Sequence, residues 1–167
     1  MPESTFDEIL DAWAGARSGG DSPEALAWMD IHPRIFGLLA DGQPVSAEQL
    51  ASASGVSGHR VAEILRQLRG DGAEFNDRGE LVGLVLTLNP TPHGFRVGGR
   101  DLFAWCSLDT MFLPGLIGRR ARVRSTCPVT GSAIELTVSP TGIEDVSLPD
   151  TMYGAEKDAV GNGGGAG

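Results

Sequence analysis

The segment PVSAEQLASASGVSGHRVAEILRQLR, residues 44–69, decides the fold of the first half of the chain. Ser46 and Gln49 stand three residues apart, which is the spacing of a capping box at the start of a helix. Small residues at 54–57 predict a turn. Apolar residues then recur at helical intervals, namely Val61, Ile64, Leu65 and Leu68. The segment therefore predicts a helix-turn-helix.

The flanking segments extend this unit. Residues 4–15 predict a short amphipathic helix. In residues 21–42, Ser22 is expected to cap a helix, Pro33 to start a second one and Gly42 to end it. On the other side, EFNDRGELVGLVLTL at 74–88 predicts a β-hairpin around the turn at 76–79. A helix-turn-helix followed by a hairpin is a winged-helix-like arrangement.

The second half of the chain predicts strands and one apolar helix. FRVGGRDLFAWCSLDTMFLPG at 95–115 indicates a short strand, a Gly-Gly turn and a buried helix from about Asp101, its cap, to Phe112, stopped by Pro114. Residues 119–148 predict two strands around 127–131 and a third after 139–142. The expected fold class is α+β, with a helical winged-helix-like domain (1–88), a small mixed β domain with the Cys-bearing helix (89–148) and a disordered tail (149–167).

Charge and composition narrow the function classes. The 13 Lys and Arg residues against 22 Asp and Glu residues give a net charge of −9, which disfavours general nucleic-acid affinity. A DNA-binding regulator stays open as an alternative, because the second helix of the helix-turn-helix carries His59, Arg60, Arg66 and Arg69 around Glu63. The N-terminus has no signal-peptide pattern, and no apolar run is long enough to span a bilayer, so we expect a cytoplasmic protein without membrane contact.

Cys106 and Asp109 form the sharpest chemical pattern. At three-residue spacing a thiol and a carboxylate share one face of a helix. A carboxylate in so apolar a segment is costly unless it is hydrogen-bonded or functional, so this Asp could hold or relay a proton. The alternative is a structural buried Cys, with an Asp that caps a loop or pairs with Arg119 or Arg120.

Other metal and thiol patterns are weaker. Cys127 begins the Cys-Pro turn CPVTG and is expected to be structural. Neither cysteine has a partner at two-residue spacing, and the three histidines, His32, His59 and His93, are scattered, so no zinc site is expected. No resident cofactor is expected either.

The order of several segments resembles the organomercurial (alkylmercury) lyases of bacterial mercury resistance. The resemblance runs through residues 38–51, 83–131 and 134–146, and its most specific parts are WCSLDT, IGRRARV and the later Cys-x-x-Thr-Gly. It implies an N-terminal winged-helix-like domain that is a structural part of an enzyme, followed by a mixed β domain that holds the site. The reaction it implies is protonolysis of a carbon–mercury bond, which gives a hydrocarbon and mercuric ion.

The resemblance also implies residue roles. Cys106 and Asp109 match catalytic positions: the soft mercury ion is captured by the Cys106 sulfur, and Asp109 relays the proton and can serve as an oxygen ligand of the product. Phe103, Trp105 and Met111 would form an apolar pocket for the organic group. Cys127 matches a further cysteine of the family that resembles a structural thiol.

The chain departs from the family in one respect. The family's second catalytic cysteine lies downstream of the CPVTG position, whereas this chain continues as PDTMYGAEKDAVGNGGGAG, which has no cysteine. Three alternatives stay open: a truncated or frame-shifted lyase, a divergent enzyme that uses an external thiol, and a non-catalytic relative that binds metal or a partner. The expected partners are organomercurials, small thiols and, as acceptor of mercuric ion, mercuric reductase. An exposed sheet edge would favour association, so a homodimer also stays open.

Overall fold

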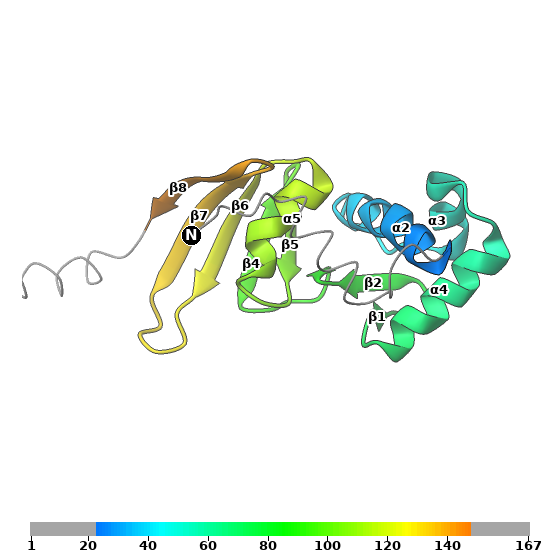
Figure 1. Cartoon of the computed structure of the whole chain (residues 1–167). Helices are drawn as coiled ribbons and strands as arrows, with labels where there is room; N and C mark the ends of the chain where they lie inside the picture. Colours follow the sequence, from blue (N-terminus) through cyan, green and yellow to red (C-terminus); the bar gives the residue numbers. More distant parts are fainter. Residues whose placement is uncertain (1–22, 148–167) are drawn as a thin grey trace, which may run out of the picture.

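The computed structural model describes residues 23–147, with side chains from Ile31 onward. The helix predicted at 4–15, the cap at Ser22 and the tail at 149–167 lie outside the described residues. Figure 1 shows a group of helices at one end and a long antiparallel sheet that extends away from it. The helices are α2 (Pro23–Leu39), α3 (Ala47–Ser54), α4 (Gly58–Gly70) and α5 (Asp109–Ile117). The strands are β1 (Glu74–Phe75), β2 (Leu81–Leu84), β3 (Leu86–Thr87), β4 (His93–Val97), β5 (Arg100–Ala104), β6 (Ala121–Thr126), β7 (Ala133–Ser139) and β8 (Gly142–Ser147).

The helix-turn-helix is confirmed in its details. The Gln49 N–H donates to Ser46 Oγ at 3.1 Å, and the Ser46 N–H donates to Gln49 Oε1 at 2.9 Å, which together form the predicted capping box of α3. The predicted apolar stripe of α4 is buried, as are Leu50 of α3 and the side chains of Ile31, Ile35, Phe36 and Leu39 in α2. Helix α3 contacts both α2 and α4. The hairpin of β1 and β2 also forms where it was predicted.

The prediction that Pro33 starts a new helix was wrong. Helix α2 runs without a break from Pro23 to Leu39. A proline inside a helix costs about 3 kcal/mol, because its ring removes one backbone donor and crowds the preceding turn. Here Ile31, Ile35 and Leu39 on both sides of Pro33 are fully buried, and their burial offsets that cost and keeps the helix continuous.

The helix predicted from Asp101 to Phe112 was also wrong at its start and its end. Residues 100–104 form strand β5, which pairs with β4 through a two-residue loop. Gly98 and Gly99 in this loop have φ values of 56° and 77°, the backbone of a type I′ hairpin turn that glycine adopts without strain. The turn folds the chain back as a strand. Helix α5 begins only at Asp109 and continues through Pro114 to Ile117.

The eight strands within residues 23–147 belong to one antiparallel sheet in the order β1-β2-β3-β5-β4-β6-β7-β8. The strands predicted around 127–131 and after 139–142 are confirmed as β6, β7 and β8. Side chains alternate between the two faces of the sheet. The inward-facing side chains of the middle strands are buried, including Phe95, Leu102, Val123 and Val138.

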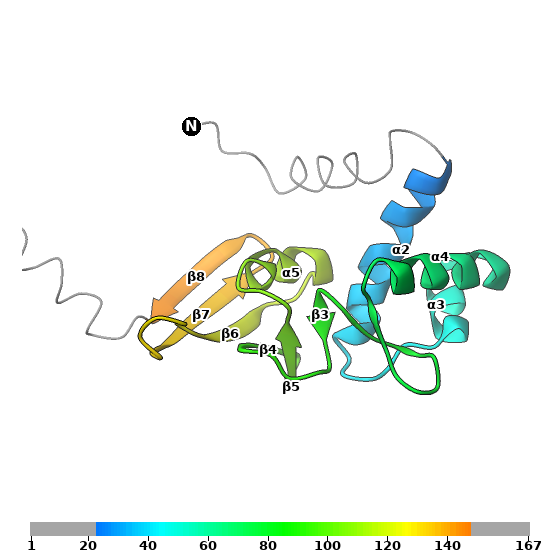
Figure 2. The same ribbon diagram turned by 90° about the horizontal axis from the view of Figure 1, so that it is seen from below.

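Helices α2 and α5 contact each other, and α5 also contacts β7 and β8, as Figure 2 shows from below. The fold is therefore a mixture of helices and an antiparallel sheet. The sheet is continuous across residues 88 and 89, and the division into domains at that point stays a prediction. No helix within residues 23–147 has the length and apolar character that crossing a membrane requires.

Candidate active site

Cys106 lies in the turn that joins β5 to α5, and its side chain is exposed to solvent. This corrects the prediction of a buried Cys-bearing helix. Two hydrogen bonds to backbone carbonyls hold this short turn. Thr110 Oγ1 donates to the Ser107 carbonyl at 2.6 Å, and the Met111 N–H donates to the Leu108 carbonyl at 3.0 Å. An exposed thiol at the tip of a hydrogen-bonded turn is accessible to a small molecule from solution.

The structure brings Cys106 and Asp109 together, although in a turn rather than on one helical face. Asp109 is the first residue of α5 and is half-buried, and its Oδ2 accepts the Cys106 N–H at 2.8 Å. A carboxylate that reaches back three residues to a backbone N–H resembles the return bond of a capping box. Among the described residues, the other oxygen, Oδ1, accepts no hydrogen bond. Oδ2 of Asp109 therefore holds the Cys106 turn, and Oδ1 is available to accept a proton or bind a ligand next to it.

The two arginines that the sequence offered as partners of Asp109 are engaged elsewhere. Arg119 Nη1 lies 3.0 Å from Asp41 Oδ1, and Arg120 Nε lies 2.6 Å from Glu144 Oε2. Asp109 is thus bound to the Cys106 backbone and forms no ion pair within the described residues.

Trp105, which directly precedes Cys106, is held at two points. Its backbone N–H donates to the Val85 carbonyl at 2.9 Å, and its indole Nε1 donates to Glu74 Oε1 at 3.0 Å. Glu74 was not found from the sequence, because its partners lie 13, 15 and 31 residues away along the chain. A glutamate followed by an aromatic residue in a hairpin carries no signal for such contacts.

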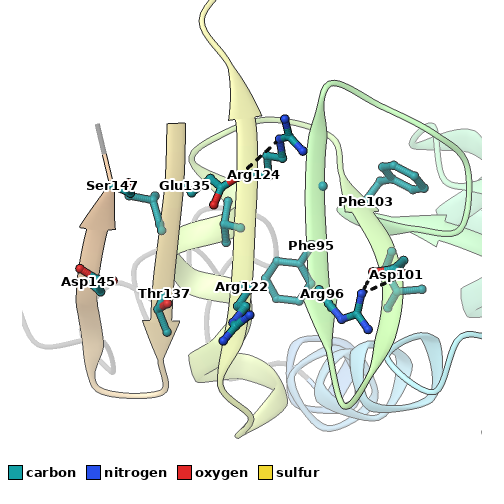
Figure 3. A pocket seen from close by; sticks show the side chains of 14 residues that line it. Phe95, Arg96, Asp101, Phe103, Arg122, Arg124, Glu135, Thr137, Asp145 and Ser147 are labelled. Carbon is teal, nitrogen blue, oxygen red and sulfur yellow. Dashed lines mark hydrogen bonds and ion pairs between the residues drawn. The ribbon is translucent and has the colours of Figure 1, made fainter. Parts of the chain in front are cut away.

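Of the three residues predicted to form an apolar pocket, only Phe103 lines the cavity that the described residues form on the sheet. This cavity has a volume of about 520 Å³ and lies along β4 to β8, with Phe103 in its wall. Figure 3 shows its lining side chains. Neither Trp105 nor Met111 lines it, and Met111 is 42% exposed on α5. The wall also carries charged side chains, including the ion pairs of Arg96 with Asp101 and of Arg124 with Glu135. An apolar pocket of Phe103, Trp105 and Met111 therefore stays a prediction.

Cys127 begins the turn between β6 and β7. Its N–H donates to the Ser132 carbonyl at 2.8 Å, and its carbonyl accepts the Gly131 N–H at 2.9 Å, so its backbone closes the turn. Hydrogen bonds from the Thr130 side chain, and then from the backbone N–H groups of Thr130 and Val129, hold the pKa of the Cys127 thiol below its usual value. A structural role for Cys127 stays a prediction.

The basic side chains of α4 make contacts within the protein. Arg60 pairs with Glu63 at 3.1 Å, and His59 lies 3.9 Å from the same carboxylate. The Arg69 guanidinium stacks 4.2 Å from the centre of the Phe75 ring. Three of the four basic groups that would face DNA are thus engaged on the protein itself. Within residues 23–147, no group of three or more His, Cys, Asp and Glu side chains is placed to hold a metal ion.

Comparison with known proteins places these features in a family. The model of the MerB alkylmercury lyase family matches residues 86–161, which include the Cys106 turn and Cys127. The alkylmercury lyase of Pseudomonas putida is 44% identical over 139 residues, covering 83% of this chain and 64% of that protein. The alkylmercury lyase of Bacillus cereus is 40% identical over 159 residues, covering 90% of this chain and 71% of that protein.

The chain is also similar in fold to a solved structure. The crystal structure of the mercury-bound form of MerB2 superposes with a TM-score of 0.63 at 28% identity, covering 85% of this chain and 65% of that one. The chain spans about two thirds of the length of the proteins that it matches. At 40% identity over most of its length, and with the same fold, the chain belongs to the alkylmercury lyase family.

Proposed function

We propose that the protein cleaves the carbon–mercury bond of organomercurials, with Cys106 as the mercury-binding nucleophile and Asp109 as the proton relay. One observation carries this proposal: an exposed thiol and a carboxylate are joined in one turn by the 2.8 Å hydrogen bond from the Cys106 N–H to Asp109 Oδ2. The alkylmercury lyases to which the chain is similar support it.

The capture step follows from the softness of mercury. The thiol of Cys106 gives up its proton, and its sulfur binds the organomercury cation, because mercury prefers sulfur to oxygen or nitrogen ligands. Asp109 lies three residues away, with Oδ2 engaged by the backbone and Oδ1 available, and it accepts the proton that the thiol releases. The negative charge of Asp109 also favours a cation at this turn.

The second step returns that proton to carbon. Asp109 delivers it to the carbon bound to mercury, and the electron pair of the carbon–mercury bond remains with the carbon. The hydrocarbon leaves, Asp109 is again a carboxylate, and Hg²⁺ stays on the Cys106 sulfur with Asp109 as an oxygen ligand. One small thiol from solution supplies the second sulfur ligand of the ion. A second small thiol displaces the Cys106 sulfur and passes its proton to that sulfur, so that the ion leaves bound to two small thiols, and mercuric reductase is the acceptor that we propose for it.

Several further proposals concern the rest of the molecule. Helices α2 to α4 with the β1–β2 hairpin act as a winged-helix-like structural unit of the enzyme, since α4 uses its basic groups within the protein. We place the domain boundary at residues 88 and 89 and the protein in the cytoplasm. Phe103, Trp105 and Met111 face the organic group, and Cys127 supports the β6–β7 turn.

The test is the release of benzene from phenylmercury by the purified protein in the presence of an excess of small-molecule thiol. We expect release by the wild type and by Cys127→Ser, the matched control that removes the other thiol, and none by Cys106→Ser. Cys106→Ser should also lose stoichiometric mercury binding. Absence of benzene with the wild type, or release that survives in Cys106→Ser, would overturn the proposal.

A further inference from the structure

Glu74 lies at the centre of a cluster of side-chain hydrogen bonds that ends beside the Cys106 turn. We propose that Glu74 is a positioning residue: together with the Val85 carbonyl, its carboxylate fixes Trp105 and thereby sets the orientation of the Cys106 turn toward the reacting mercury. This inference rests on the proposed function, because it assigns to Glu74 an effect on the reaction at Cys106.

The Glu74 carboxylate accepts hydrogen bonds from three side chains. Oε2 accepts from Thr87 Oγ1 and from Asn89 Nδ2, the latter at 2.7 Å, and Oε1 accepts from the Trp105 indole at 3.0 Å. Thr87 is fully buried, and its hydroxyl also accepts the Asn89 N–H at 3.0 Å. Hydrogen bonds to an ionised carboxylate are shorter and stronger than those between neutral groups. The contacts from Thr87 and Asn89 to Oε2 therefore hold the carboxylate in place, and Oε1 holds the indole.

The sequence at Gly83 leaves room for this carboxylate. Gly83 lies in β2, opposite Glu74 in the register of the β1–β2 hairpin. A Cβ at this position would overlap Glu74 Oε2 and would lie 2.6 Å from Thr87 Oγ1. Only a residue without a side chain allows Glu74 to reach across β2 to its partners on β3 and beyond.

The backbone of Trp105 is held by a residue with a strained backbone in the corner between β2 and β3. Val85, between β2 and β3, is the only residue other than glycine with a positive φ, 63°, in the part of the chain that the structure describes. A β-branched residue rarely adopts this conformation, and such residues persist where their surroundings demand them, often at functional sites. The carbonyl of Val85 accepts the Trp105 N–H at 2.9 Å.

The Cys106 turn is thus fixed from both sides. On one side Trp105 is tied by backbone and indole to residues of β1 and the β2–β3 corner, and on the other the Cys106 N–H is tied to Asp109. An exposed turn with neither anchor would sample many orientations. Catalytic groups act best when neighbouring hydrogen bonds restrict them to the productive geometry. Glu74 touches neither thiol nor substrate, so its effect passes through Trp105.

The test compares Glu74→Ala and Trp105→Phe with Glu80→Ala, which removes another half-buried carboxylate from the same hairpin, where it accepts from Asn76. Amide hydrogen exchange is measured by NMR at Trp105, at Cys106 and, as an internal reference, at the buried Phe95 of β4. Benzene release from phenylmercury with excess thiol gives kcat and KM for the same proteins. Glu74→Gln, which keeps one oxygen acceptor for the indole, tests rescue.

We expect Glu74→Ala and Trp105→Phe each to speed exchange at Trp105 and Cys106 by roughly tenfold or more, since each removes the anchoring bond, and to leave Phe95 unchanged. We expect kcat to fall by roughly 10-fold to 100-fold in both variants, the scale of loss known for residues that orient catalytic ligands. In Glu74→Ala the KM should stay unchanged, because Glu74 does not touch the substrate. A variant that carries both Glu74→Ala and Trp105→Phe should lose no more of its kcat than either single variant, because both changes remove the same hydrogen bond. Glu80→Ala should resemble the wild type, and Glu74→Gln should recover part of the loss.

Two results would overturn the inference. One is exchange at Cys106 that stays at the wild-type rate in both Glu74→Ala and Trp105→Phe. The other is exchange that rises equally at Phe95, which would make Glu74 a general contributor to stability. Trp105→Phe keeps the aromatic ring, so it decides the matter if Glu74→Ala does not fold. A wild type that releases no benzene would overturn the proposed function, whereas the exchange rates would still decide the role of Glu74.

Discussion

Replacing Asp109 by Asn and by Ala separates the two roles that the structure gives this side chain. Asp109 Oδ2 accepts the Cys106 N–H at 2.8 Å, so the carboxylate holds the turn, and the proposed chemistry also requires it to carry a proton. Asn keeps an oxygen that can accept the same N–H but does not ionise. Ala removes both the acceptor and the acid.

The expected magnitudes follow from this geometry. Loss of one hydrogen bond between a side chain and the backbone costs about 1 kcal/mol, and for a chain of this size that lowers Tm by roughly 2–4 °C. Asp109→Ala should show this drop, and Asp109→Asn should show less than half of it, because the hydrogen bond is retained. Turnover should fall by roughly 10²–10⁴ in both variants, the usual contribution of a positioned general acid. Mercury binding at Cys106 should survive in both.

The assay is thermal unfolding followed by circular dichroism, beside benzene release from phenylmercury and mercury binding. Turnover near the wild-type level in Asp109→Asn would refute the relay and leave Asp109 as a cap of the turn. Loss of mercury binding in Asp109→Asn would show instead that the carboxylate is needed to hold the metal. Equal losses of stability in the two variants would show that the bond to the Cys106 N–H does not hold the turn.

Three further predictions test other parts of the structure. Hydrogen bonds from the Thr130 side chain and the turn backbone lower the pKa of the Cys127 thiol. In the Cys106→Ser variant, alkylation of Cys127 by iodoacetamide should therefore reach half its maximal rate at a lower pH than alkylation of a free cysteine does. Thr130→Val should move that midpoint to higher pH. Gly83→Ala should lower the free energy of unfolding, measured with denaturant, by about 1–3 kcal/mol, the usual cost of overpacking. The added methyl group displaces the Glu74 carboxylate, which is held in place by its hydrogen bonds. An unchanged unfolding midpoint would contradict the close approach of Glu74 to Gly83. Leu113→Ala should cost about 2–5 kcal/mol, since this residue of α5 is fully buried, and a much smaller loss would mean that α5 is not packed on the core.

The elements that the sequence predicted correctly depend on local signals. The capping box at Ser46 and Gln49, the stripe of α4 and the turn of the β1–β2 hairpin each involve residues a few positions apart. Such patterns constrain the backbone whatever surrounds them. The alternation in residues 119–148 was equally local and gave three strands in the predicted places.

The wrong predictions concern segments whose local sequence fits both a helix and a strand, so that tertiary contacts decide between them. Residues 101–112 are so rich in apolar side chains that their spacing fits a helix, yet the Gly98–Gly99 turn pairs the first part with β4 as a strand. Because the helix starts later, Cys106 is exposed rather than buried. The spacing of Cys106 and Asp109 was informative all the same, since a tight turn also brings residues three apart into contact. Glu74 could not be found, because every partner it binds comes from a distant part of the sequence.

The anchors of Trp105 have a consequence for the order in which the chain is made. Glu74 precedes Trp105 by 31 residues, and Val85 lies between them, so both anchors leave the ribosome before the reactive turn does. At a synthesis rate of roughly 5–20 residues per second, this lead amounts to a few seconds, and N-terminal parts of a chain generally fold first. The hairpin and the β2–β3 corner can therefore be in place when Cys106 emerges, so that the thiol to which we assign mercury binding meets its folded support as soon as it is made.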